Sequence, residues 1–243
     1  MHSVNKMKLI LLDYDGTISP IDVSPDNAYP SAKVLESIDY SRKKGNKIAI
    51  VSMKSCYLLI DRVKADAYAC IGGAEIIYGN RSCIDTELIK YQDDAIELID
   101  FIKKDKNIKD SKAKIDIKKT SSNLIAGITI DWRFSYYPKS LPLIIEQAKK
   151  LKLKVIKYEN EPFIDILISK ANKEDSVLFL KTLFNPEITI YFGDSENDLP
   201  AFKVSDISIL VLNKYNEHLK NVGVNEIVDF DNVWEAIRRY ADN

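Results

Sequence analysis

A short apolar run that ends in two carboxylates constrains this chain more than any other feature. Residues 9–12 read LILL and are followed directly by DYDGT at residues 13–17. A continuous apolar run of this length is typical of a strand buried in a parallel sheet. Because residues i and i+2 of an extended chain point to the same side, Asp13 and Asp15 are expected to face one space. Burying a carboxylate costs several kcal/mol unless it is compensated, so the sequence predicts a cation or hydrogen-bond donors there.

Apolar runs and helical patterns alternate along the two ends of the chain. Strands are expected at 8–13, 47–52, 67–73, 187–195 and 207–213, with helices at 30–44, 54–63, 173–184, 198–205 and 233–241. This alternation is typical of an α/β fold with a parallel sheet.

The middle of the chain follows a different pattern. A helix is expected at 86–104, strands at 113–119 and 123–134, a second helix at 140–153, and strands at 154–159 and 163–169. The order αββαββ favours an antiparallel sheet with both helices on one face. We therefore expect a Rossmann-like α/β core made of residues 1–82 and 169–243, interrupted by an α+β domain at 83–168.

The charge balance argues against two classes of partner. The chain has 35 basic and 36 acidic residues, for a formal net charge of −1. No strong overall field favours nucleic acid or an anionic membrane, and no run approaches the roughly 20 apolar residues of a membrane span. We expect a cytoplasmic protein, either a monomer or a homodimer.

Cysteine and histidine are scarce. The three cysteines, Cys56, Cys70 and Cys83, lack CxxC spacing, which argues against a zinc site or a redox pair, and their odd number suits a reducing compartment. The two histidines are His2 at the terminus and His218 in a polar stretch. Acid–base chemistry is therefore expected to fall to carboxylates and lysines.

Polar residues also follow other strands of the expected sheet. Ser52 ends the second strand, Asp194 follows the strand at 187–195, and Asp198 comes four residues later in GDSEND. The carboxyl ends of parallel strands meet at one edge, where α/β sheets bind ligands. Several carboxylates at ~4 Å would repel by about 4 kcal/mol per pair, and a hard divalent cation resolves this conflict. The sequence therefore predicts a Mg²⁺ site.

These motifs resemble the four signatures of haloacid-dehalogenase-type phosphatases. DYDGT follows the first strand, VS (51–52) ends the second, a lysine precedes a helix, and GDSEND (193–198) follows a later strand. The inserted αββαββ domain resembles their C2-type cap, of the smaller subclass. The resemblance implies that Asp13 is a nucleophile forming an aspartyl-phosphate and that Asp15 is the acid and base for the leaving group and water.

The same resemblance implies ligands for the metal and the phosphate. Mg²⁺ would be held by Asp13, the main-chain carbonyl of Asp15, and Asp194, with Asp198 as a direct or indirect ligand. The phosphate would be held by Ser52, Lys173, Asn197 and the backbone amides around Gly16 and Thr17. Lys170 also precedes the helix, but Lys173 follows an asparagine, Asn172, which matches the family pattern better.

The substrate is indicated less clearly. LDYDGTISPI resembles trehalose-6-phosphate phosphatases, and on that mapping Arg133 and Asp165 would contact the sugar. Asp131 and Trp132 replace the His-Tyr pair of those enzymes, and Lys54 resembles a lysine of mannosyl-3-phosphoglycerate phosphatases. Packing in the core or at the edge of the cap is favoured over a sugar platform for the aromatic residues Trp132, Phe134, Tyr136 and Tyr137.

These features predict a Mg²⁺-dependent phosphatase of a phosphorylated sugar, and three alternatives stay open. A phosphomutase of the same fold would return the phosphoryl group to another hydroxyl. A non-catalytic subunit would bind the sugar phosphate without hydrolysing it, although such a protein could lose Asp13 or Asp15. A phospho-acceptor signalling domain would need neither Asp15 nor the cap.

Overall fold

The computed structural model describes residues 7–24 and 27–242. These residues form two compact units, each described by itself below. The core unit is Met1–Ser82 with Asn172–Asn243, and the cap unit is Cys83–Ala171. Within the described ranges, no helix has both the length and the apolar composition needed to cross a bilayer.

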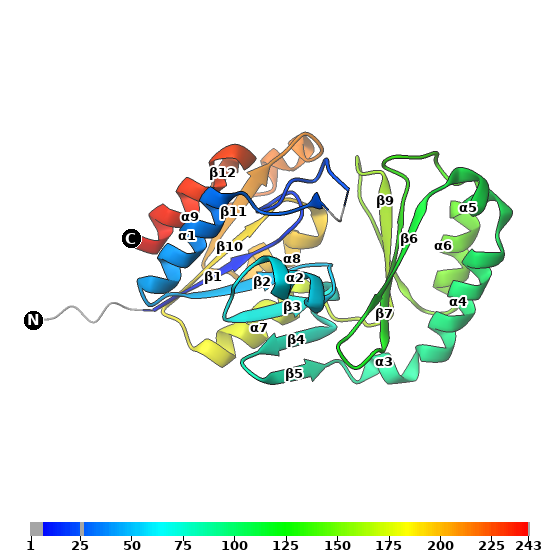
Figure 1. Cartoon of the computed structure of the whole chain (residues 1–243), viewed down its shortest axis with the longest axis horizontal. Helices are drawn as coiled ribbons and strands as arrows, with labels where there is room; N and C mark the ends of the chain where they lie inside the picture. The colour runs from blue at the N-terminus through cyan, green and yellow to red at the C-terminus, as the bar shows by residue number, and fades with distance from the viewer. Residues whose placement is uncertain (1–6, 25–26, 243) are drawn as a thin grey trace, which may run out of the picture. The chain divides into compact units, whose positions relative to one another are not determined.

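The core is built on a sheet of eight strands (Figure 1). Their order across the sheet is β12-β11-β10-β1-β2-β3-β4-β5. The strands are β1 (Lys8–Leu12), β2 (Lys47–Val51), β3 (Ala67–Cys70), β4 (Glu75–Tyr78), β5 (Arg81–Ile84), β10 (Ile188–Gly193), β11 (Ile207–Leu212) and β12 (Glu226–Asp229). Pairing is parallel from β12 to β3, and β4 runs antiparallel to β3.

The strand order reverses between β1 and β10. From β1 the chain proceeds outward through β2 and β3, whereas after the cap it returns to β10 on the other side of β1 and proceeds outward through β11 and β12. Such a reversal opens a crevice at the carboxyl ends of the two strands, because their following loops leave in opposite directions. Asp13 and Asp194 directly follow β1 and β10, so the topology brings them together.

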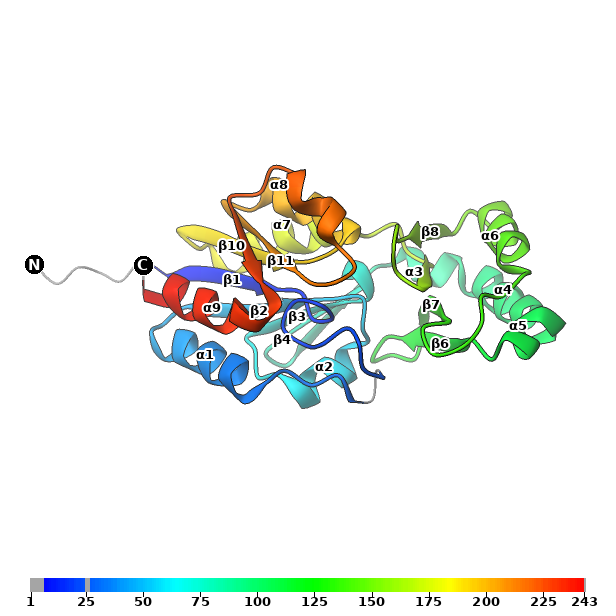
Figure 2. The same ribbon diagram turned by 90° about the horizontal axis from the view of Figure 1, so that it is seen from above.

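Helices cover both faces of the core sheet (Figure 2). One face is covered by α1 (Ala32–Lys43), α2 (Cys56–Arg62) and α9 (Val233–Asp242), and the other by α7 (Lys173–Phe184) and α8 (Leu199–Val204). Val177 and Leu180 of α7 pack with Leu9, Leu11 and other apolar residues of the sheet. Because both faces are buried there, the central strands β1, β2 and β3 are apolar along almost their whole length rather than alternating.

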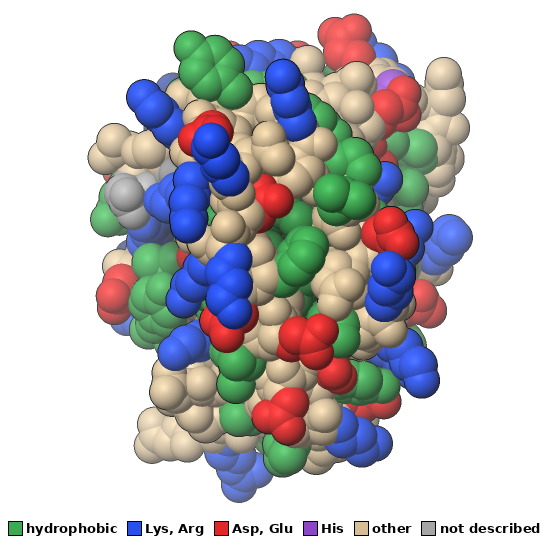
Figure 3. All heavy atoms as spheres, turned by 90° about the vertical axis from the view of Figure 1, so that its right-hand side faces the viewer, with side chains coloured by type: hydrophobic (Ala, Val, Ile, Leu, Met, Phe, Trp, Pro, Cys, Tyr) green, Lys and Arg blue, Asp and Glu red, His purple; other side chains and the backbone are tan. Residues whose placement is uncertain are grey.

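The cap is a four-stranded antiparallel sheet with helices on one side (Figure 1). The strand order is β6-β7-β9-β8. The elements are α3 (Glu87–Lys90), α4 (Gln92–Lys104), α5 (Lys106–Ser111), β6 (Lys114–Lys119), β7 (Ile125–Asp131), α6 (Leu141–Lys150), β8 (Lys154–Lys157) and β9 (Phe163–Leu167). The helix side carries charged side chains of both signs among scattered hydrophobic ones (Figure 3).

The sequence-based element boundaries differ from the structure at several places. The helix expected at 86–104 is divided at Tyr91 into α3 and α4. The strand expected at 67–73 ends at Cys70, because Ile71, Gly72 and Gly73 have positive φ angles of 51°, 65° and 100°. Strands β4, β5 and β12 were not expected.

The expectation that no cysteines form a redox pair is wrong. Cys56, at the first turn of α2, forms a disulfide with Cys70, at the end of β3, with a Cα–Cα distance of 5.4 Å. CxxC spacing is not required when two elements bring the cysteines together. Cys83 is a free, exposed cysteine.

Candidate active site

Asp13 lies at the centre of a buried cluster of charges. Its backbone amide donates to the carbonyl of Phe192 at 2.9 Å, which continues the β1–β10 pairing past the end of β1. Its side chain is buried, and Oδ2 lies 3.0 Å from Nζ of Lys173. The same ammonium lies 2.7 Å from Oδ1 of Asp198. Lys173 therefore bridges two buried carboxylates.

The start of α7 places Lys173 in this cluster. Asn172 caps the helix by accepting hydrogen bonds from the amides of Glu174 and Asp175, and Asp175 accepts one from the amide of Asn172. This capping box makes Lys173 the first helical residue. Of the two lysines considered from sequence, Lys173 is buried in the core cluster, whereas Lys170 belongs to the cap unit and is exposed.

Burial and the neighbouring charges shift the pKa values of Asp13 and Lys173. Burial raises the pKa of Asp13 to about 7, with Lys173 opposing the shift and Asp198 adding to it. Burial alone would lower the pKa of Lys173, but the carboxylates of Asp13 and Asp198 outweigh it and raise that pKa. The cluster thus has more negative charge than its one lysine balances.

Asp194 is held on both sides. Its Oδ1 accepts a hydrogen bond from the Thr17 hydroxyl at 3.1 Å, and its Oδ2 accepts one from Nδ2 of Asn213 at 2.7 Å. Nδ2 of Asn216 donates to the main-chain carbonyls of Asp194 and Val211. Sequence reasoning missed Asn213 and Asn216, which follow β11 in the stretch NKYN.

Gly16 allows the loop after β1 to approach Asp194. Its φ angle is +77°, and a Cβ atom at this position would lie 2.0 Å from Oδ2 of Asp194. Its amide donates to the carbonyl of Ser19, and the Thr17 hydroxyl donates to Asp194. Both residues therefore support the carboxylate in this structure.

Asp198 is saturated with hydrogen-bond donors. Oδ1 accepts from Lys173 and from the Tyr191 hydroxyl, both at 2.7 Å. Oδ2 accepts from the amides of Asp194 and Ser195 at 3.0 Å and from the Ser195 hydroxyl at 3.3 Å. A carboxylate offers about four lone-pair positions, so these donors leave no capacity for direct metal coordination. Asp198 instead fixes the loop that carries Asp194.

The ends of β1 and β2 are joined by a second ion pair. Nζ of Lys54 lies 3.0 Å from Oδ2 of Asp15, whose side chain is partly exposed. Ser52 is buried, and its Oγ accepts a hydrogen bond from the amide of Lys54 at 3.2 Å. The structure thus places Asp15, Ser52 and Lys54 along the same edge of the sheet as Asp13.

The donor set fits a magnesium ion. One carboxylate oxygen from each of Asp13, Asp194 and Asp198 lies within 4.8 Å of the others. Mg²⁺ prefers oxygen ligands and uses one or two carboxylates, with waters and substrate phosphate completing its shell. Asp13 and Asp194 suit this role, and a divalent cation beside them would offset the excess negative charge.

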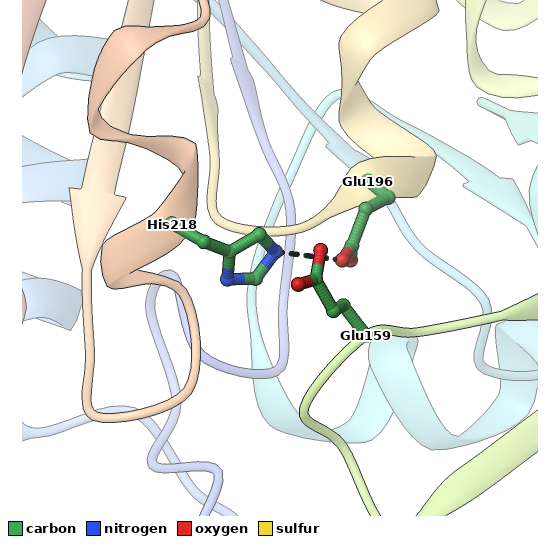
Figure 4. Close-up of side chains that lie close together, drawn as sticks. All are labelled: Glu159, Glu196 and His218. Carbon is green, nitrogen blue, oxygen red and sulfur yellow. Dashed lines mark hydrogen bonds and ion pairs between the residues drawn. The ribbon is translucent and has the colours of Figure 1, made fainter.

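Two further polar residues lie in short helical turns, Asn197 after β10 and His218 after β11. Asn197 is half-buried in the short helix Glu196–Asp198. Nε2 of His218 lies 2.9 Å from Oε1 of Glu196 (Figure 4). The histidine thus pairs with a carboxylate outside the Asp13–Lys173–Asp198 cluster.

The predicted sugar-binding residues belong to the cap. Asp165 is buried and accepts hydrogen bonds from Lys118 at 2.9 Å, Tyr158 at 2.8 Å and Thr129. These donors outweigh burial and lower its pKa. The guanidinium of Arg133 lies 5.3 Å from the ring centroid of Phe163. Asp165 is thus engaged within the cap.

The aromatic side chains of residues 132–137 are largely exposed in the cap unit. The exposed fractions of Phe134, Tyr136 and Tyr137 are 69%, 74% and 53%. Trp132 contacts Tyr137 edge to face, with ring centroids 5.3 Å apart. The rings of Phe134, Tyr136 and Tyr137 therefore lie at the surface of the cap unit rather than in its core.

Comparison with known proteins links this fold to phosphatases. Residues 132–242 match the sucrose-6F-phosphate phosphohydrolase family. A search of curated proteins found no match. A solved trehalose-6-phosphate phosphatase related protein has a TM-score of 0.75 at 18% identity, covering 96% of this chain and 97% of that one. The C. albicans trehalose-6-phosphate phosphatase C-terminal domain has a TM-score of 0.75 at 18% identity, with 98% and 92% covered.

A third similar structure names the superfamily. BT1666 from Bacteroides thetaiotaomicron, among the phosphatases of the haloalkanoate (HAD) enzyme superfamily, has a TM-score of 0.67 at 15% identity, covering 99% of this chain and 97% of that one. The chain therefore has the α/β fold of the HAD superfamily phosphatases with an inserted cap, and from residue 132 to 242 its sequence matches the sucrose-6F-phosphate phosphohydrolase family.

Proposed function

We propose that this protein is a Mg²⁺-dependent phosphatase that hydrolyses a sugar phosphate through an aspartyl-phosphate at Asp13. The observation that carries the proposal is the buried contact of Asp13 with Lys173 at the strand-order reversal, beside Asp194. A nucleophile next to a fixed cation suits phosphoryl transfer, where catalysis is mainly positioning and charge stabilisation.

In the first half-reaction, a carboxylate oxygen of Asp13 attacks phosphorus and the bond from phosphorus to the sugar oxygen breaks. Asp15 gives its proton to that oxygen. In the second half-reaction, Asp15 takes a proton from water, which attacks phosphorus and releases inorganic phosphate. The carboxylate of Asp13 is thereby restored, and one difficult displacement is divided into two steps.

The surrounding residues orient the phosphoryl group. Lys173 and the Ser52 hydroxyl would contact its oxygens, with Asn197 beside them. Bound Mg²⁺, held by Asp13, Asp194 and the main-chain carbonyl of Asp15, would supply charge neutralisation. Asp198 would hold Lys173 and the Asp194 loop in place.

The substrate proposed is a phosphorylated sugar, with a disaccharide phosphate favoured. Support comes from the match to sucrose-6F-phosphate phosphohydrolases and from the fold shared with trehalose-6-phosphate phosphatases. We propose that the cap selects the sugar through Arg133 and its exposed aromatic rings, with Lys54 near the leaving group. The position of Lys54 keeps a mannosyl-3-phosphoglycerate among the candidates.

The test is inorganic phosphate release from sucrose-6F-phosphate, trehalose-6-phosphate, mannosyl-3-phosphoglycerate and glucose-6-phosphate, with Mg²⁺ and with EDTA. We expect metal-dependent release that Asp13→Asn abolishes and that the exposed control Asp231→Asn retains. Isomerised sugar phosphate without free phosphate would indicate a mutase. Binding without turnover of any substrate would contradict the phosphatase and favour a binding subunit.

A further inference from the structure

Tyr191 reaches the charge cluster from inside the core sheet. It lies in the middle of β10, and its side chain is fully buried. Its ring packs edge to face against Phe202 of α8, with centroids 5.7 Å apart, and belongs to an apolar cluster with Leu9 and Val177. A phenylalanine would satisfy this packing, so the hydroxyl needs a separate explanation.

The hydroxyl donates to the oxygen that Lys173 also contacts. Oδ1 of Asp198 accepts hydrogen bonds from the Tyr191 hydroxyl and from Nζ of Lys173, each at 2.7 Å. Burial, followed by the nearby carboxylates, raises the pKa of Tyr191 well above its usual value, so the group stays a protonated donor. In a buried site, such charge-assisted hydrogen bonds are strong.

Two donors share the negative charge of Oδ1 of Asp198, so each is attracted to it less strongly than a single donor would be. With the hydroxyl present, part of the charge on Oδ1 is offset, and the ammonium of Lys173 also lies 3.0 Å from Asp13. Without the hydroxyl, Oδ1 would lose one of these two donors, and the ammonium of Lys173 would be drawn toward Asp198, away from Asp13 and the phosphoryl group.

We propose that Tyr191 is a positioning residue, which by donating to Oδ1 of Asp198 keeps the ammonium of Lys173 between Asp198 and Asp13, within reach of the transferring phosphoryl group. This inference rests on the proposed phosphatase function. It adds to the site a residue three positions before Asp194 that contacts neither substrate nor metal.

Tyr191→Phe removes the hydroxyl and keeps the ring. The matched control is Tyr68→Phe, because Tyr68 is also buried in the core sheet and its hydroxyl donates to the carbonyl of Val63 at 2.7 Å. Tyr191→Phe loses the hydrogen bond to Asp198, whereas Tyr68→Phe loses two, because the Tyr68 hydroxyl also accepts from the amide of Ala65 at 3.0 Å. The control is therefore expected to lose at least as much thermal stability as Tyr191→Phe. For Tyr191→Phe we expect kcat/KM to fall about tenfold and orthophosphate, measured by calorimetry with Mg²⁺, to bind several-fold more weakly.

The Mg²⁺ concentration for half-maximal activity should change less than about twofold, because Asp194 keeps its donors. In a Lys173→Gln background, Tyr191→Phe should weaken orthophosphate binding no further. Equal kinetics and orthophosphate affinity for the Tyr191 and Tyr68 variants, or additive losses with Lys173→Gln, would overturn the positioning role. A wild-type protein that neither hydrolyses sugar phosphates nor binds orthophosphate would instead overturn the proposed function, and this inference with it.

Discussion

The ammonium of Lys54 lies 3.0 Å from Oδ2 of Asp15, and this ion pair connects the loop after β2 to the loop after β1. Lys54 follows Ser52 by two positions, and its amide donates to the Ser52 hydroxyl oxygen. The pair therefore orients the proposed acid and base from the same segment that carries a proposed phosphate ligand.

Lys54→Met should impair proton transfer more than phosphate binding. The Asp15 side chain would lose its partner and its fixed position, so kcat on a sugar phosphate should fall by roughly tenfold or more. The fall on p-nitrophenyl phosphate should be smaller, because that leaving group needs little protonation. Lys43→Met, which removes the exposed Lys43–Asp39 pair, is the control. Equal falls on both substrates would count against a role through Asp15.

Lys173→Met should destabilise the core when Mg²⁺ is absent. The substitution leaves Asp13 and Asp198 buried without their cation, and breaking a buried pair costs about 3–5 kcal/mol. Chemical denaturation at pH 7 measures this loss, and added Mg²⁺ should restore part of it by binding the folded state. Lys170→Met, at an exposed position, should change little. An unchanged denaturation midpoint for Lys173→Met would be inconsistent with the buried bridge.

Asn213→Ala should weaken Mg²⁺ binding. Its amide donates to Oδ2 of Asp194 at 2.7 Å, and loss of a group that orients a metal ligand typically costs 10–100-fold in metal affinity. The readout is the Mg²⁺ dependence of phosphate release. Asn225→Ala, which loses hydrogen bonds to Ser208 instead, is the matched control. A similar Mg²⁺ dependence for both variants would rule out a role for Asn213 at the metal.

The parts of the site that sequence could predict are those tied to strand ends. Asp13, Ser52 and Asp194 each follow an apolar run, and the parallel topology alone brings such positions to one edge. Tyr191 and Asn213 could not be found this way. Tyr191 reads as one more residue of a buried strand, and the contacts of both depend on side-chain directions that only the folded structure gives.

The fold, like the site, could be predicted only where the sequence has a regular pattern. The α/β rhythm and the αββαββ insert follow from periodicity, whereas short elements do not. The turn at Gly79–Asn80 between β4 and β5 was the available signal for those two strands. Strand β12 is only half-buried and lies at the edge of the sheet, so its alternating pattern is weak.

The disulfide should contribute measurably to stability. Cys56 and Cys70 are separated by 14 positions, and closing a loop of about 15 residues stabilises a protein by roughly 3 kcal/mol. Reduction with dithiothreitol, or Cys56→Ala with Cys70→Ala, should lower the denaturation midpoint. Cys83→Ala, at the exposed free cysteine, is the control. Unfolding curves that coincide with and without reductant would show that the bridge does not form or does not stabilise the fold.

Asp66 should make stability depend on pH below about 4. Burial raises its pKa, but hydrogen bonds from the Ile48 amide, Lys47 and Arg42 outweigh burial and lower it below the ordinary 3.8. A carboxylate with a depressed folded pKa contributes stability above its unfolded pKa and loses it as pH falls through the folded value. Asp66→Asn should therefore cost roughly 1–3 kcal/mol at pH 7 and progressively less below pH ~4 in denaturation experiments. The exposed control Asp39→Asn should show a much smaller effect at pH 7, and a cost for Asp66→Asn that is the same at pH 7 and pH 3 would contradict the charged pairing.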